Sequence, residues 1–419
     1  MGSDERWRQV VRAAGLTGSG GGVRPTIFEE MSALARRTGA INLGQGFPDD
    51  DGPAVITDVA REAIADGVNQ YAPGRGIEPL REAIVRHQAR HYGIDLDPQT
   101  QVAVTNGATE AIAAAVLALS GPGDEVLTLE PYYDSYAAVI AMAGAEHVTA
   151  PLVAGAQAGG EQGFGLDTTA LREAFSPRTK VVLLNSPHNP TGAVLRRAEL
   201  ELIAELARAH DAIVVTDEVY EHLTYDGAVH IPIATLPGMA DRTLTISSAG
   251  KTFSLTGWKI GWVSGPAELV TAVVTIKQFL TYTGGAPFQP AVAHALDLET
   301  SEGPDATWVA DLATDLAERR DLLIAGLQRA GFAVVRPQGC YFVIADARTW
   351  LERYDLADGE ALCQALPHLA GVAAVPVSAF TVPGSRVDGE LAGAVRFTFT
   401  KSREVISAAL ARLAEPSAP

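Results

Sequence analysis

Cysteine and lysine are both scarce in this 419-residue sequence. The two cysteines, Cys340 and Cys363, cannot form a disulfide framework or a multi-cysteine metal site, and no metal site is predicted. The five lysines stand at positions 180, 251, 259, 277 and 401, which leaves few candidates for amine chemistry. Acidic residues outnumber basic residues by 50 to 32, for a net charge of −18, and this excess argues against a nucleic-acid partner.

Long apolar runs are absent as well. The longest, Ala111–Leu119, is far too short to cross a bilayer, and the polar, charged start Met1–Val11 is unlike a secretory signal. The apolar fraction of 47% is ordinary for a globular protein. The composition therefore predicts a soluble, cytoplasmic protein that does not bind a membrane.

From residue 102 onward, short β-type runs alternate with helical runs. Strands are predicted at 102–105, 125–129, 180–185, 212–216, 243–247 and 260–264, and helices at 108–119, 133–143 and 197–209. The strand segments are apolar on both faces, which is typical of buried strands in a mostly parallel sheet. Past about residue 300, a long helix near 308–330 and strands at 332–335, 341–345 and 395–400 predict a smaller α+β domain.

This order predicts four parts of the chain. They are a flexible N-terminal tail at 1–24, an arm at 25–58 that joins the small domain, a large domain at 59–300 and a small C-terminal domain at 301–419. The glycine-rich stretch 17–22 predicts a flexible joint, and the Gly- and acid-rich stretch 154–165 predicts an exposed loop.

Lys251 follows the strand predicted at 243–247. It lies in a Gly-Lys-Thr sequence that suggests a phosphate-binding loop, but that motif requires glycine at position 245, where Thr245 stands. The phosphate-loop interpretation therefore fails. A lone lysine after a strand is usually a solvated loop residue, so its role depends on the residues around it.

Three other polar turns also follow predicted strands. Asp217 and Tyr220 follow the carboxyl end of a predicted strand, where α/β proteins bind ligands. A helix-capping Asp beside a packed Tyr gives the same pattern. The turn at 185–192 can present the amide of Asn189 to a ligand, or be a plain rigid turn. The stretch 106–110 opens a helix whose free N–H groups form an anion cup, unless they need only a cap.

Together these turns supply a lysine, a carboxylate, a tyrosine, an amide and an anion cup, which is the set that pyridoxal phosphate requires. With these motifs the chain resembles the fold-type I, class I aminotransferases over about residues 24–415. The motifs that carry the resemblance are 42–48 (NLGQGFP), 70–71 (QY), 107–110 (GATE), 189–192 (NPTG), 217–220 (DEVY), Ser248 with Lys251, and Arg396-Phe397. Within the family, the chain is most similar to the branch of kynurenine/glutamine transaminases and N-succinyldiaminopimelate aminotransferases.

The resemblance implies an α/β fold, in which a large domain with a mostly parallel seven-stranded sheet flanked by helices is joined to a smaller α+β domain. It also implies three catalytic residues. Lys251 binds pyridoxal 5′-phosphate covalently and then serves as the base that moves a proton. Asp217 pairs with the pyridine N–H of the cofactor, and Tyr220 donates to its phenolate oxygen.

The other implied contacts surround the cofactor and the substrate. Asn189 donates to the phenolate and Tyr133 stacks on the ring, although Tyr133 could also be only a packed aromatic at a helix start. The implied phosphate ligands are Ala108, Thr109, Ser248, Lys259 and Tyr71 of the partner subunit, so that a homodimer shares its two sites. Gly46, Asn189 and Arg396 are the implied substrate-binding residues. Arg396 would clamp the α-carboxylate, unless it is a surface residue at a strand edge.

The implied reaction moves an amino group between an L-amino acid and a 2-oxo acid. N-succinyl-LL-2,6-diaminopimelate with 2-oxoglutarate, in lysine biosynthesis, is the favoured pair. Kynurenine/glutamine or methionine/aromatic transamination and cysteine-S-conjugate β-lyase activity remain alternatives. A pyridoxal-phosphate-binding transcription regulator is disfavoured, because about 24 residues before Pro25 are too few for a DNA-binding domain.

Overall fold

The computed structural model describes residues 3–18, 20–156 and 162–416 of the chain. Its main sheet has eight strands in the order β2-β9-β8-β7-β6-β3-β4-β5. The bounds of these strands are β2 Val102–Asn106, β3 Glu125–Glu130, β4 Glu146–Ala156, β5 Gln162–Leu166, β6 Thr179–Asn185, β7 Ile213–Asp217, β8 Thr243–Ser248 and β9 Ile260–Ser264. The five strands from β8 to β4 are parallel, whereas β9 and β5 run antiparallel to their neighbours.

Helices cover both faces of this sheet. Along β6, Val181 and Leu183 pack in one apolar cluster, and the alternate residues Val182 and Leu184 pack in another on the opposite face. The covering helices are α3 Ala54–Ala65, α4 Glu78–Tyr92, α5 Gly107–Leu119, α6 Ser135–Ala143, α7 Thr168–Ala174, α8 Arg197–Ala209, α10 Ala267–Leu280 and α11 Phe288–Asp297. Burial on both faces explains why these strands read as continuous apolar runs in the sequence.

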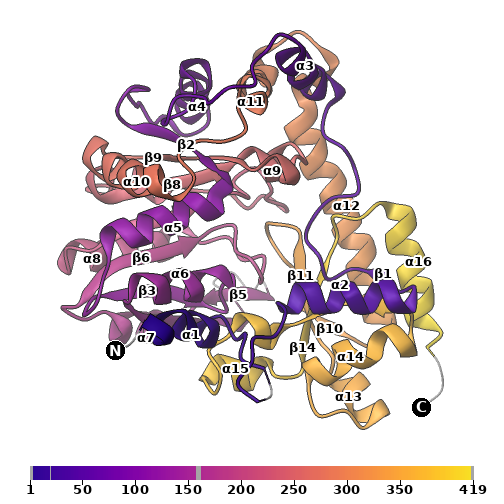
Figure 1. Cartoon of the computed structure of the whole chain (residues 1–419). Coiled ribbons are helices and arrows are strands. Elements are labelled where there is room, and N and C mark those ends of the chain that lie inside the picture. Colours follow the sequence, from indigo (N-terminus) through magenta and orange to yellow (C-terminus); the bar gives the residue numbers. More distant parts are fainter. Residues whose placement is uncertain (1–2, 19, 157–161, 417–419) are drawn as a thin grey trace.

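A second, smaller layer stands beside the main sheet, at the lower right of Figure 1. Its four strands follow the order β10-β11-β14-β13 and are all antiparallel. They are β10 Ala333–Val334, β11 Phe342–Asp346, β13 Val375–Pro376 and β14 Ala394–Thr398. Their helices are α12 Trp308–Arg329, α13 Arg348–Tyr354, α14 Gly359–Leu369, α15 Arg386–Leu391 and α16 Arg403–Ala414. The long helix and the strands predicted past residue 300 are thus present.

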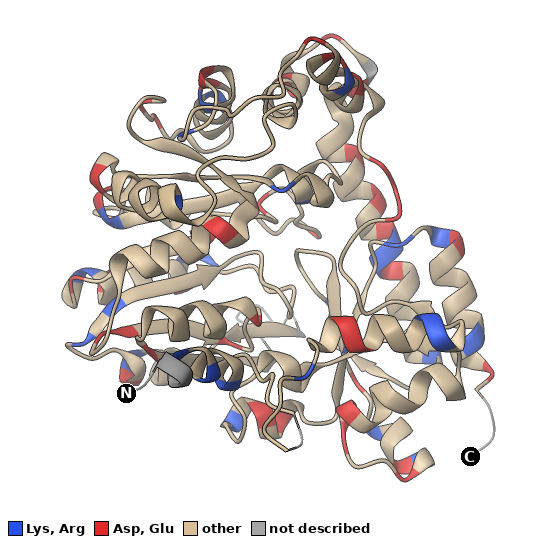
Figure 2. Cartoon of the chain, in the orientation of Figure 1, with Lys and Arg blue, Asp and Glu red and all other residues tan. Residues whose placement is uncertain are grey.

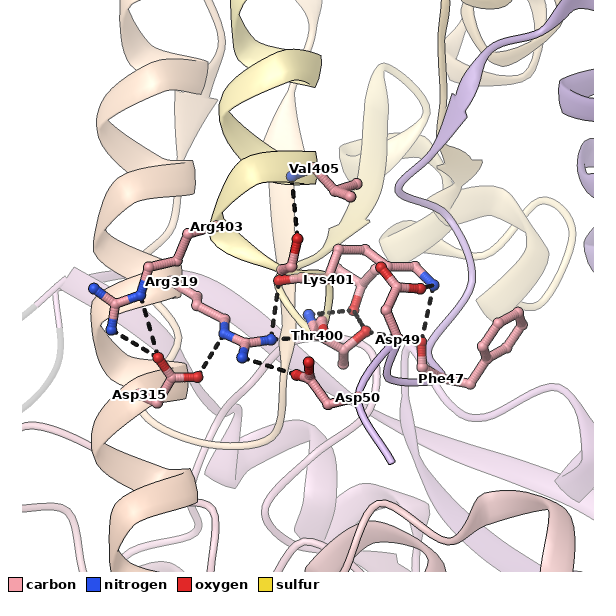
Figure 3. Close-up of polar contacts among 11 residues, drawn as sticks. Phe47, Asp49, Asp50, Asp315, Arg319, Thr400, Lys401, Arg403 and Val405 are labelled. Carbon is pink, nitrogen blue, oxygen red and sulfur yellow. Dashed lines mark hydrogen bonds and ion pairs between the residues drawn. The ribbon is translucent and has the colours of Figure 1, made fainter. Parts of the chain in front are cut away.

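The N-terminal arm joins this small layer. Helix α2 (Ile27–Thr38) packs against α14, and β1 (Ile41–Asn42) pairs in parallel with β12 (Val372–Ala373). Figure 3 shows how the arm is held further on: Lys401 Nζ lies 2.6 Å from Asp49 Oδ1 and 3.1 Å from the carbonyl oxygen of Phe47. Arg319 on α12 pairs with Asp50 at 2.8 Å. Lys401, for which the sequence suggested no role, therefore fixes the arm.

Two predictions about irregular segments are wrong. The stretch 154–165 contains the end of β4 and the start of β5, which form a hairpin anchored by the buried Phe164, and its middle residues 157–161 lie outside the described residues. This hairpin gives the sheet eight strands in place of the expected seven. In the expected tail, residues Ser3–Ala13 form helix α1, which packs against α6 (Figure 1). None of the described helices has the length and apolar character needed to cross a membrane.

Candidate active site

A cavity of about 350 Å³ opens at the carboxyl ends of the central strands, between the main sheet and the small layer. The ends of β6, β7 and β8 and the start of α5 line one side of it. Residues of β11, β14 and the N-terminal arm line the other. Polar residues at the carboxyl ends of parallel strands meet at the same edge of a sheet, which is where α/β proteins bind ligands. The four polar turns singled out in the sequence therefore meet in one place.

Lys251 enters this cavity from α9 (Ala249–Thr252), a single turn directly after β8. Its Nζ donates a hydrogen bond to the hydroxyl of Tyr341 at 2.7 Å, and that hydroxyl donates to the carbonyl oxygen of Gly46 at 2.6 Å. Tyr341 thus ties the lysine to the N-terminal arm. A Cβ at Gly46 would lie 2.3 Å from Cζ of Phe342, so a side chain at this position would displace the Phe342 ring.

Asp217 closes β7 at the base of the cavity, where it is buried. Its Oδ2 accepts a hydrogen bond from the hydroxyl of Tyr136 at 2.7 Å, and its Oδ1 accepts one from the backbone N–H of Val219 at 3.3 Å. Burial raises the pKa of Asp217 to about 6, although these hydrogen bonds oppose the rise. A cation beside the carboxylate would remove most of this burial cost, so the position suits a protonated ring nitrogen.

Tyr220 and Asn189 line the cavity together with Asp217. The Tyr220 ring is buried, meets the Tyr341 ring edge-on at 5.0 Å between centroids, and lies 5.7 Å from Lys251 Nζ. Asn189 is held by its backbone N–H, which donates to Asn185 Oδ1 at 2.7 Å. Because Asn189 Oδ1 accepts from Arg396, its amide N–H₂ is free to point at a ligand oxygen.

The predicted phosphate ligands gather at the start of α5. Ala108 and Thr109 occupy the first turn of this 13-residue helix, and Ser248 and Lys259 line the cavity beside them. The approach is close because a Cβ at Gly261 on β9 would lie 2.6 Å from the carbonyl carbon of Gly107. Free N–H groups, a hydroxyl and an ammonium together make an anion site.

Arg396 on β14 is buried at 1% exposure, so it is not a surface residue at a strand edge. Its guanidinium donates to Asn189 Oδ1 and to the carbonyl oxygen of Gly44, both at 2.9 Å, and lies 3.9 Å from the centroid of Phe342. Both acceptors are uncharged, and its Nε has no hydrogen-bond partner among the described residues. Burial lowers its pKa to about 10, which still leaves it charged at neutral pH. A carboxylate is the natural counterpart of such a group.

All but one of the predicted site residues line this cavity. Tyr133 does so from the turn before α6, whereas Tyr71 lies outside it, 84% exposed, with its ring against Tyr282. The sequence interpretation missed Tyr136 and Tyr341. Tyr136 lies three residues after Tyr133 and could have been considered as an alternative site residue. Tyr341 belongs to no motif, and only the folding of the chain brings it to Lys251.

This donor set fits pyridoxal 5′-phosphate. Among the described residues, the buried carboxylate of Asp217 forms no ion pair. The anion site at α5 has the donors that a phosphate needs, and Lys251 lines the same cavity. Arg396, whose Nε has no hydrogen-bond partner among the described residues, lines this cavity as well.

Comparison with known proteins shows the family of the chain. The family model for aminotransferase class I and II matches residues 38–413. A probable N-succinyldiaminopimelate aminotransferase of Mycobacterium tuberculosis is 55% identical over 392 residues, covering 93% of this chain and 95% of the relative. The solved structure of N-succinyldiaminopimelate aminotransferase from that organism matches with a TM-score of 0.86, covering 93% of this chain and 97% of the other. Kynurenine–oxoglutarate transaminase 3 of Mus musculus is 37% identical, covering 93% and 87%.

These matches span nearly the whole chain. The chain shares the fold-type I architecture of the solved structure, here with a large mixed sheet flanked by helices and a separate small sheet. The expected fold class is thereby confirmed, apart from the number of strands. The chain belongs to the class I and II aminotransferases, enzymes that use pyridoxal 5′-phosphate to transfer amino groups.

Proposed function

We propose that this enzyme transfers the amino group of N-succinyl-LL-2,6-diaminopimelate to 2-oxoglutarate, as a step of lysine biosynthesis. The observation that carries this substrate assignment is the 55% identity to the Mycobacterium tuberculosis relative of that name, against 37% for the kynurenine transaminase. The chemistry itself is supported by Lys251, Asp217 and Arg396 facing one cavity.

When bound, pyridoxal 5′-phosphate supplies an electron sink for the carbon that carries the amino group. Lys251 is the base that moves the proton at this carbon, and the hydroxyl of Tyr341 holds its amine at 2.7 Å. Asp217 keeps the ring nitrogen protonated, because its buried carboxylate is stabilised by the positive charge. Tyr220 and Asn189 donate hydrogen bonds to the phenolate oxygen.

Arg396 receives the α-carboxylate of the substrate, with Gly46 and Asn189 at its side. Its two hydrogen bonds to uncharged acceptors hold the guanidinium plane in place before the substrate arrives. A preformed, desolvated cation loses little freedom on binding, which favours a carboxylate over a neutral group. Tyr133 packs over the ring of the cofactor.

The phosphate is held by Ala108, Thr109, Ser248, Lys259 and Tyr71 of the partner subunit. We infer a homodimer because Tyr71 lies outside the cavity of its own chain and is 84% exposed. Exposed apolar side chains stand near it in sequence or in space, namely Val68, Phe279, Leu280 and Tyr282. Burying this group against a second copy would remove apolar surface from water.

We infer further that the chain divides at the boundaries predicted from sequence, into residues 1–24, 25–58, 59–300 and 301–419. We also infer that the enzyme is cytoplasmic and binds neither nucleic acid nor membrane. The free thiols of the two buried cysteines suit a reducing compartment.

A panel of amino donors with 2-oxoglutarate tests the substrate. N-succinyl-LL-2,6-diaminopimelate should give the highest kcat/KM, and kynurenine, glutamine, methionine and phenylalanine should give values at least tenfold lower. A higher kcat/KM with kynurenine would overturn the substrate assignment. Release of pyruvate and ammonia from a cysteine conjugate without an oxo-acid acceptor would reveal β-lyase activity. Lys251→Ala serves as the control, because it should abolish transamination of every donor.

A further inference from the structure

Three histidines gather away from the active-site cavity, where α4 meets the turn after β7. His87 and His91 stand four residues apart and therefore on the same face of α4, and His222 lies in the turn that also carries Tyr220. The three ring centroids are 4.6, 4.8 and 5.0 Å apart. The rings are tilted by 48° to 84° to one another, so this is not a stack.

We propose that His87, His91 and His222 bind a divalent transition-metal ion of the Zn²⁺ type. Imidazole nitrogens are the ligands that such ions prefer in proteins, and one nitrogen from each ring lies within 4.8 Å of the others. This site could not be predicted from the sequence, because His222 is distant from His87 and His91 in the chain.

The spacing of the rings suits one shared ion. Zn–N bonds of about 2.0–2.1 Å in a tetrahedral set place ligand nitrogens about 3.3 Å apart and ring centroids roughly 5 Å apart. The centroid distances already have this size. His87 Nε2 and His222 Nε2 now share a hydrogen bond at 2.7 Å. The ion would replace this bond and increase the distance between the two nitrogens by about half an ångström.

A carboxylate stands beside the cluster. Glu299, just after α11, places Oε2 2.8 Å from His91 Nε2 and 3.4 Å from Arg90 Nε. An ion bound here would therefore take the place of the contact between His91 Nε2 and Glu299 Oε2. Glu299 is placed to complete a fourth position and to offset part of the charge of a divalent ion.

Part of the cluster is accessible from solvent. His91 and His222 are only half-buried, which leaves a path for the ion from solvent.

The consequence of binding would be structural. The ion would join α4 to the turn 217–222, which carries Asp217 and Tyr220, and would reach α11 through Glu299. Glu221 in this turn also accepts a hydrogen bond from Ser247, next to the predicted phosphate ligand Ser248. A four-ligand site without an open position is typical of structural zinc, so the ion stabilises this turn and takes no part in the reaction.

Zn²⁺ titration of chelator-treated holoenzyme tests the site, with binding followed by calorimetry and the bound ion counted by elemental analysis. We expect one ion per chain. His91→Ala and His222→Ala should each lower the affinity for Zn²⁺ at least tenfold. Mutation of residues that only hydrogen-bond a metal ligand already lowers metal affinity by about 10- to 100-fold. The matched control is His294→Ala, an exposed histidine on α11, which should bind as the unaltered enzyme does.

Two further readouts keep the outcome clear. Co²⁺ in place of Zn²⁺ should show the visible bands of a tetrahedral imidazole site in the unaltered enzyme and lose them in His91→Ala. Zn²⁺ should raise the unfolding temperature of the unaltered enzyme and leave that of His91→Ala unchanged. Absence of a bound ion, or equal binding by His91→Ala and His222→Ala, would overturn the proposal. His87→Ala is not used, because truncation of this buried ring could impair folding by itself.

Discussion

At the scale of single residues, Arg396 carries a positive charge in a place that excludes water. The residue is 1% exposed, and within the described parts of the chain its guanidinium donates only to an amide oxygen and a carbonyl oxygen. Neutral acceptors repay only part of the cost of burying a charge. An anionic ligand therefore gains most by binding at this point.

Arg396→Lys tests this role. A lysine keeps the charge but loses the planar pair of N–H groups, and charge-assisted hydrogen bonds are worth about 1.5–3 kcal/mol each. We expect kcat/KM to fall roughly 10- to 150-fold, with most of the change in KM for both the amino acid and the oxo acid. Steady-state kinetics with both substrates measures this. An unchanged KM would show that another group receives the carboxylate.

Burial of the Asp217 carboxylate lowers the free energy of unfolding by an amount that depends on pH. Its pKa is about 3.9 in an unfolded chain and about 6 in the fold, where burial raises it. Between these values the folded chain binds more protons, so stability decreases as pH rises from about 4 to about 6. At pH 7 the cost to the cofactor-free protein is about 3 kcal/mol.

Asp217→Asn should therefore stabilise the cofactor-free protein at pH 7 by up to about 2–3 kcal/mol and have little effect near pH 4, while transamination is lost. Urea unfolding at both pH values measures this. Tyr136→Phe is the matched control, because it removes the hydrogen bond that lowers this pKa and should destabilise the protein at pH 7. Equal stability of Asp217→Asn and the unaltered protein at pH 7 would contradict the assignment of cost to this carboxylate.

Tyr341 is a positioning residue, since its hydroxyl lies between Lys251 Nζ and the carbonyl oxygen of Gly46. Tyr341→Phe keeps the ring and removes both hydrogen bonds, at about 0.5–1.5 kcal/mol each. We expect kcat to fall roughly 5- to 150-fold with KM nearly constant, and the pH profile of kcat to move. Loss of cofactor absorbance in this variant would instead indicate a role in cofactor binding.

At the scale of elements, the strands of the main sheet could be predicted because each is apolar on both faces. The strand at Ile260–Ser264 and the helix at Arg197–Ala209 have the predicted bounds. Since polar turns follow three parallel strands, their meeting at one edge could be predicted too. Strand β5 could not, because glycine- and acid-rich sequence forms a strand there only by pairing with β4 and burying Phe164.

Where the N-terminal arm reaches the cavity, the ion pair between Lys401 and Asp49 is one of the contacts that hold it. Lys401, 6% exposed, binds Asp49 and the carbonyl oxygen of Phe47, and Phe47 lines the cavity. Lys401→Met fills the same space without the charge. We expect a loss of about 1–2 kcal/mol in stability and a several-fold rise in KM with a smaller change in kcat. Arg403→Met, which removes an exposed cation of the same region, is the control and should alter neither.

At the scale of the whole molecule, the net charge of −18 coexists with a cationic cavity. Figure 2 shows charged residues of both signs over the outer helices and loops, while the strands of the main sheet carry few. Lys251, Lys259 and Arg396 face the cavity that anionic ligands would enter. The acid excess therefore says nothing about the charge of the substrate, which is set by these local groups.

The proposed homodimer can be tested by complementation between a chain that binds the cofactor weakly and a chain that is inactive. Tyr71→Ala should weaken cofactor binding roughly tenfold, because hydrogen bonds to charged groups are worth about 1.5–3 kcal/mol, and Lys251→Ala should be inactive. In a mixed dimer with shared sites, the Tyr71→Ala chain keeps Lys251 and receives Tyr71 of the partner subunit, so one complete site is restored. At limiting pyridoxal 5′-phosphate, the mixed dimer should recover up to about half of the unaltered activity. If each chain used its own Tyr71, mixing would restore nothing.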